Sequence, residues 1–424
     1  MVAFNTVRVN QLAWYEDNEF ELQFPSSWDV TACYMKGYSA PALSEEQLKQ
    51  AFVNPIGTPR IRELAKGKKE VVILFDDLTR PTKVFQLVPY ILQELEEAGI
   101  PDENIRFIST LGAHGAMKRM DFAKKLGEEI VSRFAIYNHN CYDNCTYLGQ
   151  TSSGTPVHIN SEVMACDLKI AVGGIITHSR GGFGGGAKAV VPGVSAMETI
   201  CANHLNVGAG PPTPENPAGK RHPSVRKGNV DDNLARLDME EVARMIGLDI
   251  IVNVVMNGKR DPVGLFVGDL VAAHREGAKL AREIYATKPV SNVDIVVLNV
   301  YSKSNEANLF GFTGSGWFKE GGGSLVLISN TPEGWVTHYL AGAFGKTIGG
   351  PRWLPSSSPL PPSINKVIVF APYPEQTLKK RLGPPQSVVL AKTWLEVIEE
   401  LREDYPGRAK VAVIPDGVME LFPD

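Results

Sequence analysis

Three polar segments of this chain combine residue types that could bind an anion or move a proton. The first, Asp76 to Arg80, directly follows the apolar run Val71 to Phe75. The guanidinium of Arg80 is a planar donor suited to a carboxylate or phosphate, and Asp77 could orient it or hold a ligand hydroxyl. The alternative is that the aspartates and Thr79 cap the next helix and that Arg80 is a solvated surface charge.

His114 follows a second apolar run, Ile105 to Leu111, and is flanked by small residues and glycine. Because the charge of histidine changes near neutral pH, an imidazole at the end of a strand is a candidate acid or base. A single histidine is more often structural than catalytic, so the local pattern leaves both interpretations open.

The glycine-rich segment Thr177 to Gly193 is the most distinctive of the three. It contains His178 and Lys188, and five of the six residues from Gly181 to Gly186 are glycine. Glycine allows the backbone to approach a phosphate or a flat ring closely, at an entropic cost that a plain connection has no reason to bear. This segment is therefore predicted to bind a ligand.

Two familiar phosphate-binding patterns do not account for this segment. A Walker loop needs Ser or Thr after its lysine, but Ala189 follows Lys188. The stretch Gly182 to Ala187 satisfies a dinucleotide-binding pattern, yet no second strand with an acidic end follows at the required distance. Lys188 is instead predicted to be a covalent or cationic anchor, because burial lowers the pKa of a lysine. His204, further along in a helical pattern, becomes a candidate metal ligand.

The elements that must position these residues are short β-branched runs that alternate with helical patterns. The runs are Val71 to Phe75, Ile105 to Leu111, Leu168 to Val172, Ile250 to Val255, Ile295 to Val300, Leu325 to Ile328, Val367 to Ala371 and Val411 to Ile414. They predict an α/β fold with parallel or mixed sheets flanked by helices. The length of 424 residues predicts two domains with the active site in the cleft between them. The helical segment from Asp269 to Ala286 resembles a crossing between domains, so we expect an N-terminal cofactor-binding domain over 1–275 and a C-terminal domain over 280–424.

The composition is that of an ordinary globular protein, with 43% apolar and 21% charged residues. A formal net charge of −4 does not indicate the excess of basic residues that is typical of proteins that bind nucleic acid or an anionic membrane. The chain has neither a long apolar run nor a signal-like N-terminus, so we expect a cytoplasmic protein. Five thinly spread cysteines are expected to be reduced thiols; Cys141 and Cys145 could bind a metal, but they lack a second Cys/His pair nearby.

Taken in order, these motifs resemble the nickel-dependent lactate racemase family. The likeness covers nearly the whole chain, because it extends to Asn54 to Gly57, Glu63 to Gly67, Gly268 to His274 and Val413 to Gly417. It implies an isomerase that racemises or epimerises a 2-hydroxy acid by reversible hydride transfer to a nickel-pincer nucleotide. This cofactor is a pyridinium-3-thioamide-5-thiocarboxylic acid mononucleotide that holds nickel and is made by separate maturation enzymes.

The resemblance also implies a role for each candidate site residue. His114 and His178 would face each other across the substrate as acid/base groups, and Arg80 would hold the substrate carboxylate. Lys188 would carry the cofactor covalently, and His204 would ligate nickel. The remaining cofactor-binding residues would be Asp77, Gly182, Gly184, Gly185 and Gly186.

Elementary chemistry agrees with this mechanism. Inversion of the carbinol carbon by deprotonation would create a dianion, whereas hydride removal by a cationic pyridinium ring leaves a planar 2-keto acid that accepts hydride on either face. A racemase then needs two bases, each contributing about 10²- to 10⁴-fold, because either enantiomer presents its hydroxyl to a different side.

One segment departs from the family pattern. After Tyr301 the family carries a glutamine and a lysine that contact the substrate, and the aligned positions here are Leu309 and Phe312. All three residues are candidate substrate-binding residues. Because two apolar side chains replace an amide and an ammonium, the predicted substrate is larger than lactate. Other residues that could line the site are Lys303, Asn305, Asn308, Trp335 and His338.

Two alternative functions remain compatible with these motifs. The chain could be a nucleotide-binding protein of the same fold without pincer-dependent racemase activity, or it could epimerise a larger, sugar-derived acid with the same cofactor. The expected partners are a small-molecule 2-hydroxy acid and the cofactor maturation enzymes, with neither nucleic acid nor membrane among them.

Overall fold

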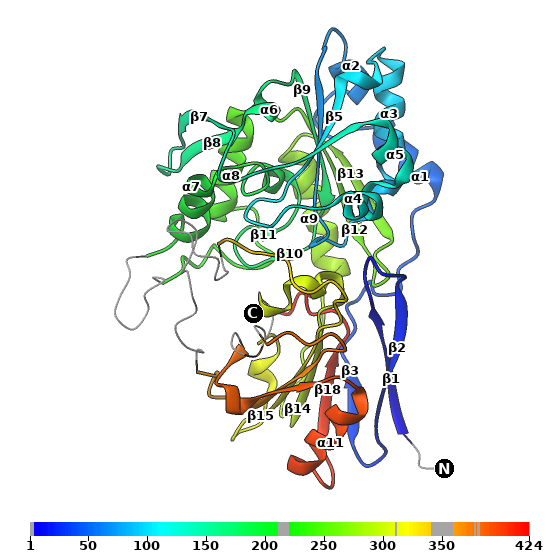
Figure 1. Ribbon diagram of the computed structural model, residues 1–424, viewed down its shortest axis with the longest axis vertical. Helices are drawn as coiled ribbons and strands as arrows, with labels where there is room; N and C mark the ends of the chain where they lie inside the picture. The colour runs from blue at the N-terminus through cyan, green and yellow to red at the C-terminus, as the bar shows by residue number, and fades with distance from the viewer. Residues whose placement is uncertain are drawn as a thin grey trace. The chain divides into compact units, whose positions relative to one another are not determined.

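The computed structural model describes residues 4–210, 220–309, 312–340, 359–376, 379 and 382–423 (Figure 1). The chain divides into two compact units, which we call the main unit and the split unit. The main unit comprises Ser39–Ile284 and Thr337–Arg352. The split unit comprises Met1–Tyr38, Tyr285–Val336 and Trp353–Asp424.

The main unit is built on a six-stranded mixed sheet with the strand order β13-β12-β9-β4-β5-β6. All neighbouring pairs are parallel except β12 and β13. The strands are β4 (Val71–Phe75), β5 (Ile105–Ser109), β6 (Ala135–Asn138), β9 (Leu168–Gly174), β12 (Ile250–Met256) and β13 (Pro262–Gly268). Every residue of β4, β9 and β12 is buried, as expected for parallel strands covered on both faces.

Helices of the main unit pack their apolar sides on this sheet. In α3 (Val88–Glu97), Val88, Ile91 and Leu95 are buried at helical spacing, and the chain turns at Gly99, where φ is 81°. The other helical segments are α1 (Glu45–Val53), α2 (Ile61–Leu64), η1 (Val84–Gln86), η2 (Asp102–Asn104), α4 (Arg119–Leu126), α5 (Glu128–Arg133), α6 (Ser161–Met164), α7 (Met197–Cys201), α8 (Leu234–Met245) and α9 (Ala272–Ile284). A separate hairpin joins β7 (Cys145–Gln150) to β8 (Pro156–Asn160).

The split unit contains a parallel sheet with the order β17-β16-β15-β14-β18-β3. Its strands are β3 (Asp29–Ala32), β14 (Ile295–Asn299), β15 (Gly323–Ile328), β16 (Ile364–Phe370), β17 (Val388–Ala391) and β18 (Lys410–Ile414). The unit also holds the antiparallel hairpin of β1 (Phe4–Gln11) and β2 (Asn18–Pro25), the helix α11 (Trp394–Asp404) and the short turns η6 (Ser315–Trp317) and η7 (Pro385–Ser387). The two sheets confirm the predicted α/β class.

The N-terminal 38 residues belong to the split unit, whereas the sequence-based division placed them in a domain over 1–275. The physical reason is strand pairing: β3 lies parallel to β18, with Asp29 opposite Lys410 and Ala32 opposite Val413. The hairpin adds to the same core, since Phe24 packs on Trp394 with ring centroids 5.4 Å apart. This long-range pairing has no local signal in the sequence.

Two further findings concern the whole described chain. None of its helices has both the length and the apolar character needed to cross a bilayer. All five cysteines are free thiols, as predicted, and burial raises the pKa of Cys141 to about 12 and that of Cys145 to about 11.

Phe24→Ala should lower the free energy of unfolding of the split unit by about 3–5 kcal/mol, because Phe24 is fully buried and truncation leaves a cavity beside Trp394. Urea denaturation followed by tryptophan fluorescence measures this loss. The matched control is Phe85→Ala in the main unit, where the side chain is 40% exposed and the expected cost is below about 0.5 kcal/mol. Equal effects of the two substitutions would contradict the proposed packing role of Phe24.

Candidate functional site

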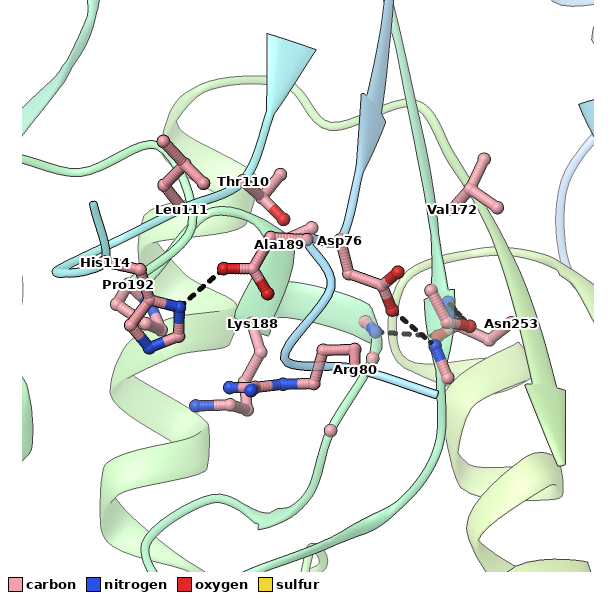
Figure 2. Close-up of a pocket in the computed structure, with 16 residues that line it drawn as sticks. Asp76, Arg80, Thr110, Leu111, His114, Val172, Lys188, Ala189, Pro192 and Asn253 are labelled. Atoms are coloured by element: carbon pink, nitrogen blue, oxygen red, sulfur yellow. Dashed lines mark hydrogen bonds and ion pairs between the residues drawn. The ribbon is translucent and has the colours of Figure 1, made fainter. Parts of the chain in front are cut away.

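The candidate site lies at the carboxyl edge of the main sheet, beside β4 and β9. The chain leaves β4 toward β5 and β6 on one side and later returns to β9 on the other, so the strand order reverses between β4 and β9. Such a reversal is the usual ligand-binding position in open α/β sheets. A small cavity of about 50 Å³, partly open to solvent, lies here (Figure 2). Its lining includes Asp77, Arg80, His114, Gly184, Gly185 and Lys188.

Asp77 organises the turn after β4. Its Oδ1 accepts hydrogen bonds from the backbone N–H of Thr79 at 2.9 Å and from the Thr79 hydroxyl at 2.5 Å. Arg80 then donates from Nη1 to Thr79 Oγ1 at 2.6 Å. The helix-cap alternative is therefore wrong for Asp77, since its carboxylate closes a turn and the next helical segment begins after Lys83.

His114 lies against the second oxygen of Asp77, with 2.6 Å between His114 Nδ1 and Asp77 Oδ2. Burial alone would raise the pKa of Asp77, but the adjacent His114 ring and the Arg80 guanidinium lower it to about 2. The carboxylate is therefore ionised near neutral pH. It fixes the orientation of the His114 imidazole, as in carboxylate–histidine pairs that support proton transfer.

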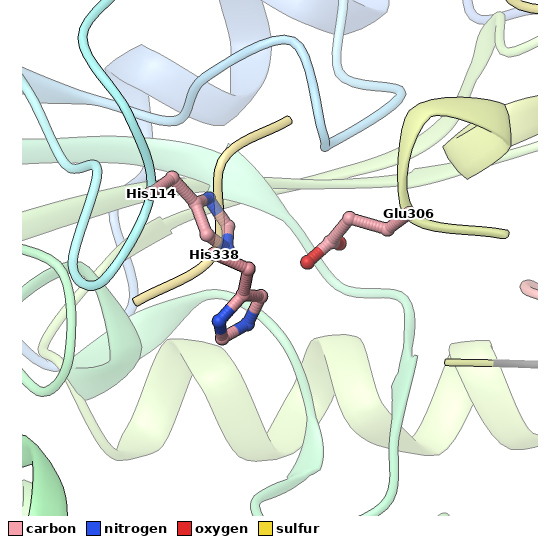
Figure 3. Close-up of side chains that lie close together, drawn as sticks. All are labelled: His114, Glu306 and His338. Carbon is pink, nitrogen blue, oxygen red and sulfur yellow. The ribbon is translucent and has the colours of Figure 1, made fainter. Parts of the chain in front are cut away.

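His338 lies beside His114 in the same unit, although the two are distant in sequence. The segment around His338 pairs with the loop after β5: Gly115 N–H donates to Thr337 O at 2.8 Å, and Tyr339 N–H donates to Ala113 O at 2.7 Å. The two imidazole rings meet edge to face with centroids 4.9 Å apart (Figure 3). His338 thus lies at the candidate site.

Asp76, next to Asp77, has a structural role. Its Oδ1 lies 2.7 Å from Nζ of the fully buried Lys125, and its Oδ2 accepts from the Thr82 hydroxyl at 2.7 Å. Lys125 also donates to the carbonyl of Arg80 at 2.9 Å. This buried ion pair holds the turn that presents Arg80, and removing one partner would leave an uncompensated charge.

The glycine-rich segment forms the short strands β10 (Thr177–His178) and β11 (Gly182–Phe183) and the turn η3 (Gly186–Ala189). Two of its glycines are required by the protein's own packing. At Gly182, where φ is 72°, an added Cβ would lie 1.8 Å from the carbonyl oxygen of Asn229. At Gly186, where φ is 57°, it would lie 2.9 Å from the ring of His274. Close approach to a ligand is therefore not the only reason for this composition.

Three buried side chains that the sequence analysis missed hold this segment. Arg236, on α8, donates to the carbonyl oxygens of Gly181 (3.1 Å), Gly185 (3.1 Å) and Phe183. His274 Nε2 lies 2.8 Å from Gly184 O, and Asn253 Oδ1 accepts from Gly186 N–H at 2.6 Å. The available signal was weak: a polar residue in the buried run Ile250 to Val255 marks Asn253, but nothing local marks Arg236.

Lys188, His178 and His204 meet at one end of the glycine-rich segment. Lys188 is 7% exposed, and its Nζ lies 3.4 Å from Nε2 of His204. The rings of His178 and His204 have centroids 6.0 Å apart. Nδ1 of His178 accepts backbone N–H bonds from Arg180 (3.2 Å) and Gly181 (3.0 Å), which places the proton of the neutral ring on Nε2.

His204 lies in a single π-helical turn, η4 (Ala202–Asn206), which continues α7. π-Turns within helices frequently occur at functional sites. Burial lowers the pKa of His204 well below its ordinary value, and the positive charges of Lys188 and Arg180 lower it further. Its Nδ1 is buried and has no hydrogen-bond partner among the described residues. A neutral imidazole with an unsatisfied nitrogen has the chemistry of a metal ligand.

The candidate substrate residues after β14 lie in the split unit. Tyr301 begins the kinked 3-10 segment η5 (Tyr301–Leu309) and is 3% exposed, while Phe312 is 36% exposed. The side chain of Leu309 falls outside the described part of the chain. Trp335 N–H donates to Glu375 Oε1 at 2.9 Å. Lys303 forms a buried ion pair with Glu306. The charge of Lys303 is therefore already balanced within its own segment.

The fold and the site together define an α/β protein with a cation-rich candidate site at the carboxyl edge of a mixed sheet. Residues 15–212 match the lactate racemase N-terminal domain. The chain is 29% identical over 395 residues to the lactate racemase of Lactiplantibacillus plantarum, covering 88% of this chain and 90% of that protein. It is 28% identical over 303 residues to the lactate racemase of Thermoanaerobacterium thermosaccharolyticum, covering 70% and 68%.

Solved structures share the fold. The lactate racemase apoprotein from Thermoanaerobacterium thermosaccharolyticum superposes with a TM-score of 0.72 at 23% identity, covering 99% of this chain and 100% of that chain. A crystal structure from Thermotoga maritima gives a TM-score of 0.63 at 17% identity, covering 90% and 99%. These structures show a shared fold, and the sequence matches support the resemblance to the lactate racemase family that the motifs indicated.

The Asp77 carboxylate should make stability depend on acid pH. Its pKa is lowered from 3.8 to about 2, so its ionisation stabilises the fold above about pH 4, and this contribution is lost as pH falls toward 2. The unfolding free energy of Asp77→Asn should therefore lie below that of the parent chain at pH 5, and the gap should shrink by about 2 kcal/mol toward pH 2. Urea denaturation at several pH values measures the gap; a gap independent of pH would contradict the lowered pKa.

Proposed function

We propose that this protein is a nickel-dependent racemase or epimerase of a 2-hydroxy acid. The observation that carries the proposal is the contact of Lys188 Nζ with the buried imidazole of His204, next to His178, at the ligand-binding edge of the main sheet. The Lys188 amine lies on the glycine-rich segment and would anchor a ligand covalently. The neutral His204 imidazole lies on the π-turn and would bind a metal that the same ligand carries. The activity of the lactate racemase relatives supports the same conclusion.

The residues present fit a nickel-pincer nucleotide. Lys188 would anchor it, the unsatisfied imidazole of His204 would ligate the nickel, and Gly184, Gly185 and Asp77 would line its site. When bound, the pyridinium ring would supply a hydride acceptor that can return the hydride to either face of a 2-keto acid. All other steps fall to side chains of this chain.

Those side chains bind the substrate and move its hydroxyl proton. Arg80, held by the turn that Asp77 organises, would bind the substrate carboxylate through its planar guanidinium. His114, oriented by Asp77, and His178, oriented by two backbone N–H groups, would each remove the hydroxyl proton from one enantiomer and return it to the other. Each imidazole is fixed at its Nδ1 side, so its Nε2 would exchange the proton.

Lys188→Ala should abolish covalent attachment of the cofactor and all racemisation while the protein stays folded, because the amine would be the anchor. The measurement is intact-mass spectrometry with nickel analysis on protein made together with the maturation enzymes. The companion variant His204→Ala should keep the mass increment on Lys188 and lose nickel. A mass increment that survives Lys188→Ala would overturn the anchor, and a parent chain with neither nickel nor increment would favour a nucleotide-binding protein without pincer-dependent activity.

His114→Ala and His178→Ala should each reduce turnover about 10²-fold or more in both directions, because every inversion uses one histidine as base and the other as acid. Chiral chromatography of both enantiomers, with cofactor loading checked by mass, gives the rates. His222→Ala is the control, because His222 is exposed and does not line the cavity. A near-normal rate for either variant would make that histidine structural.

The substrate should be larger than lactate and carry an uncharged side chain. Leu309 and Phe312 occupy the aligned positions of a glutamine and a lysine, and apolar contact contributes about 25 cal/mol per Å² whereas an unpaired buried charge costs several kcal/mol. A panel of enantiopure lactate, malate, 2-hydroxyisocaproate, phenyllactate and gluconate tests this. The fastest turnover should fall on 2-hydroxyisocaproate or phenyllactate, and a preference for lactate would show that the alignment after Tyr301 is wrong.

A further inference from the structure

Arg180 has a firmly held backbone in the glycine-rich segment, two residues after His178. Its N–H donates to Nδ1 of His178 at 3.2 Å, and its carbonyl accepts from Nδ2 of Asn233 at 2.9 Å. Asn233 caps α8, the helix that also carries Arg236. The position of Arg180 is therefore tied to the same elements that place His178 and the glycine-rich segment.

The guanidinium of Arg180 is in a different state from that of Arg80. Its Nη1 is buried and has no hydrogen-bond partner among the described residues, whereas Nη1 of Arg80 donates to Thr79. A buried donor without an acceptor is costly, and a cationic one is more costly still. The protein bears this cost at a site that is proposed to bind an anionic ligand.

The surroundings of Arg180 are positively charged. Burial lowers its pKa, and the nearby Arg221 guanidinium lowers it further. Arg180 and Lys188 both act on His204 as positive charges. Arg221, which donates to Ser179 O at 3.3 Å, comes from the far side of the loop that follows η4. Among the described residues that line the cavity, the carboxylates are Asp76 and Asp77, and each is already paired, Asp76 with Lys125 and Asp77 with His114.

We propose that Arg180 is an oxyanion-binding residue of this site, distinct from the carboxylate clamp Arg80. The inference rests on the proposed function and deepens it. The oxyanion has two possible sources with one chemistry, the phosphate of the mononucleotide and a second acidic group on the substrate. With an uncharged substrate side chain, as proposed above, the phosphate is the ligand of Arg180.

The first experiment uses the apo protein and therefore does not depend on nickel or turnover. Isothermal titration calorimetry with nicotinic acid mononucleotide, and with inorganic phosphate, compares the parent chain with Arg180→Gln. Loss of a charge-assisted bond should weaken mononucleotide binding about tenfold or more. Arg244→Gln removes a guanidinium from an exposed position of α8 and should leave the affinity unchanged.

One further variant keeps the inference falsifiable if Arg180→Gln is unstable. Arg180→Lys retains the charge but loses the planar fork, so it should bind with intermediate affinity. Thermal denaturation of both variants reports whether each is folded before the titration. If folded Arg180→Gln binds the mononucleotide as tightly as the parent chain does, the phosphate is not the ligand of Arg180.

The second experiment uses the cofactor-loaded enzyme and separates the two sources. If the oxyanion belongs to the substrate, Arg180→Gln should lower kcat/KM for malate about tenfold or more while changing that for lactate far less. An unchanged mononucleotide affinity together with unchanged malate selectivity would overturn the inference. Absence of nickel and of a mass increment on Lys188 would instead refute the proposed function, and the titration with apo protein would still test Arg180.

Discussion

The candidate site depends on one buried cation. The guanidinium of Arg236 donates to three carbonyl oxygens of the segment Gly181 to Gly185. The backbone carbonyls of this segment therefore point inward, toward the positive charge of Arg236. Burial lowers the pKa of Arg236 to about 10, so it remains protonated near neutral pH. Without that charge, three buried carbonyls would need other donors, and the path of the chain toward Lys188 would no longer be determined.

The same helix also positions the metal-ligand candidate. Two residues after Arg236, Asp238 accepts from Nδ2 of Asn203 at 2.7 Å and from the hydroxyls of Thr151 and Thr155. Asn203 precedes His204 in the π-turn. One element, α8, therefore holds Lys188 through the glycine-rich segment and His204 through its neighbour Asn203. This explains how two residues from separate segments keep Lys188 Nζ and His204 Nε2 3.4 Å apart.

Much of the architecture could be predicted from local pattern. Val71 to Phe75 is β4 as predicted, and Arg80 and His114 lie beyond strand ends because parallel strands collect their carboxyl ends at one edge. What could not be predicted depends on contacts between distant residues. Three features have no signature within a short stretch of sequence: the role of the Arg236 side chain, the pairing of β3 with β18 and the packing of Gly182 on Asn229. Each depends on a partner residue that is distant in the sequence.

The N-terminal strand has a consequence for how the polypeptide is made. Residues 39–284, which hold nearly all of the main unit, leave the ribosome as one continuous stretch and can fold as they emerge. The first 38 residues emerge earlier but cannot complete their sheet, because β3 must wait for β18 at the opposite end of the chain. Until β18 and α11 have been made, β3 has no strand to pair with and the hairpin of β1 and β2 has no helix to cover it. The nascent chain thus carries an unpaired strand from residue 32 until residue 410 has been added.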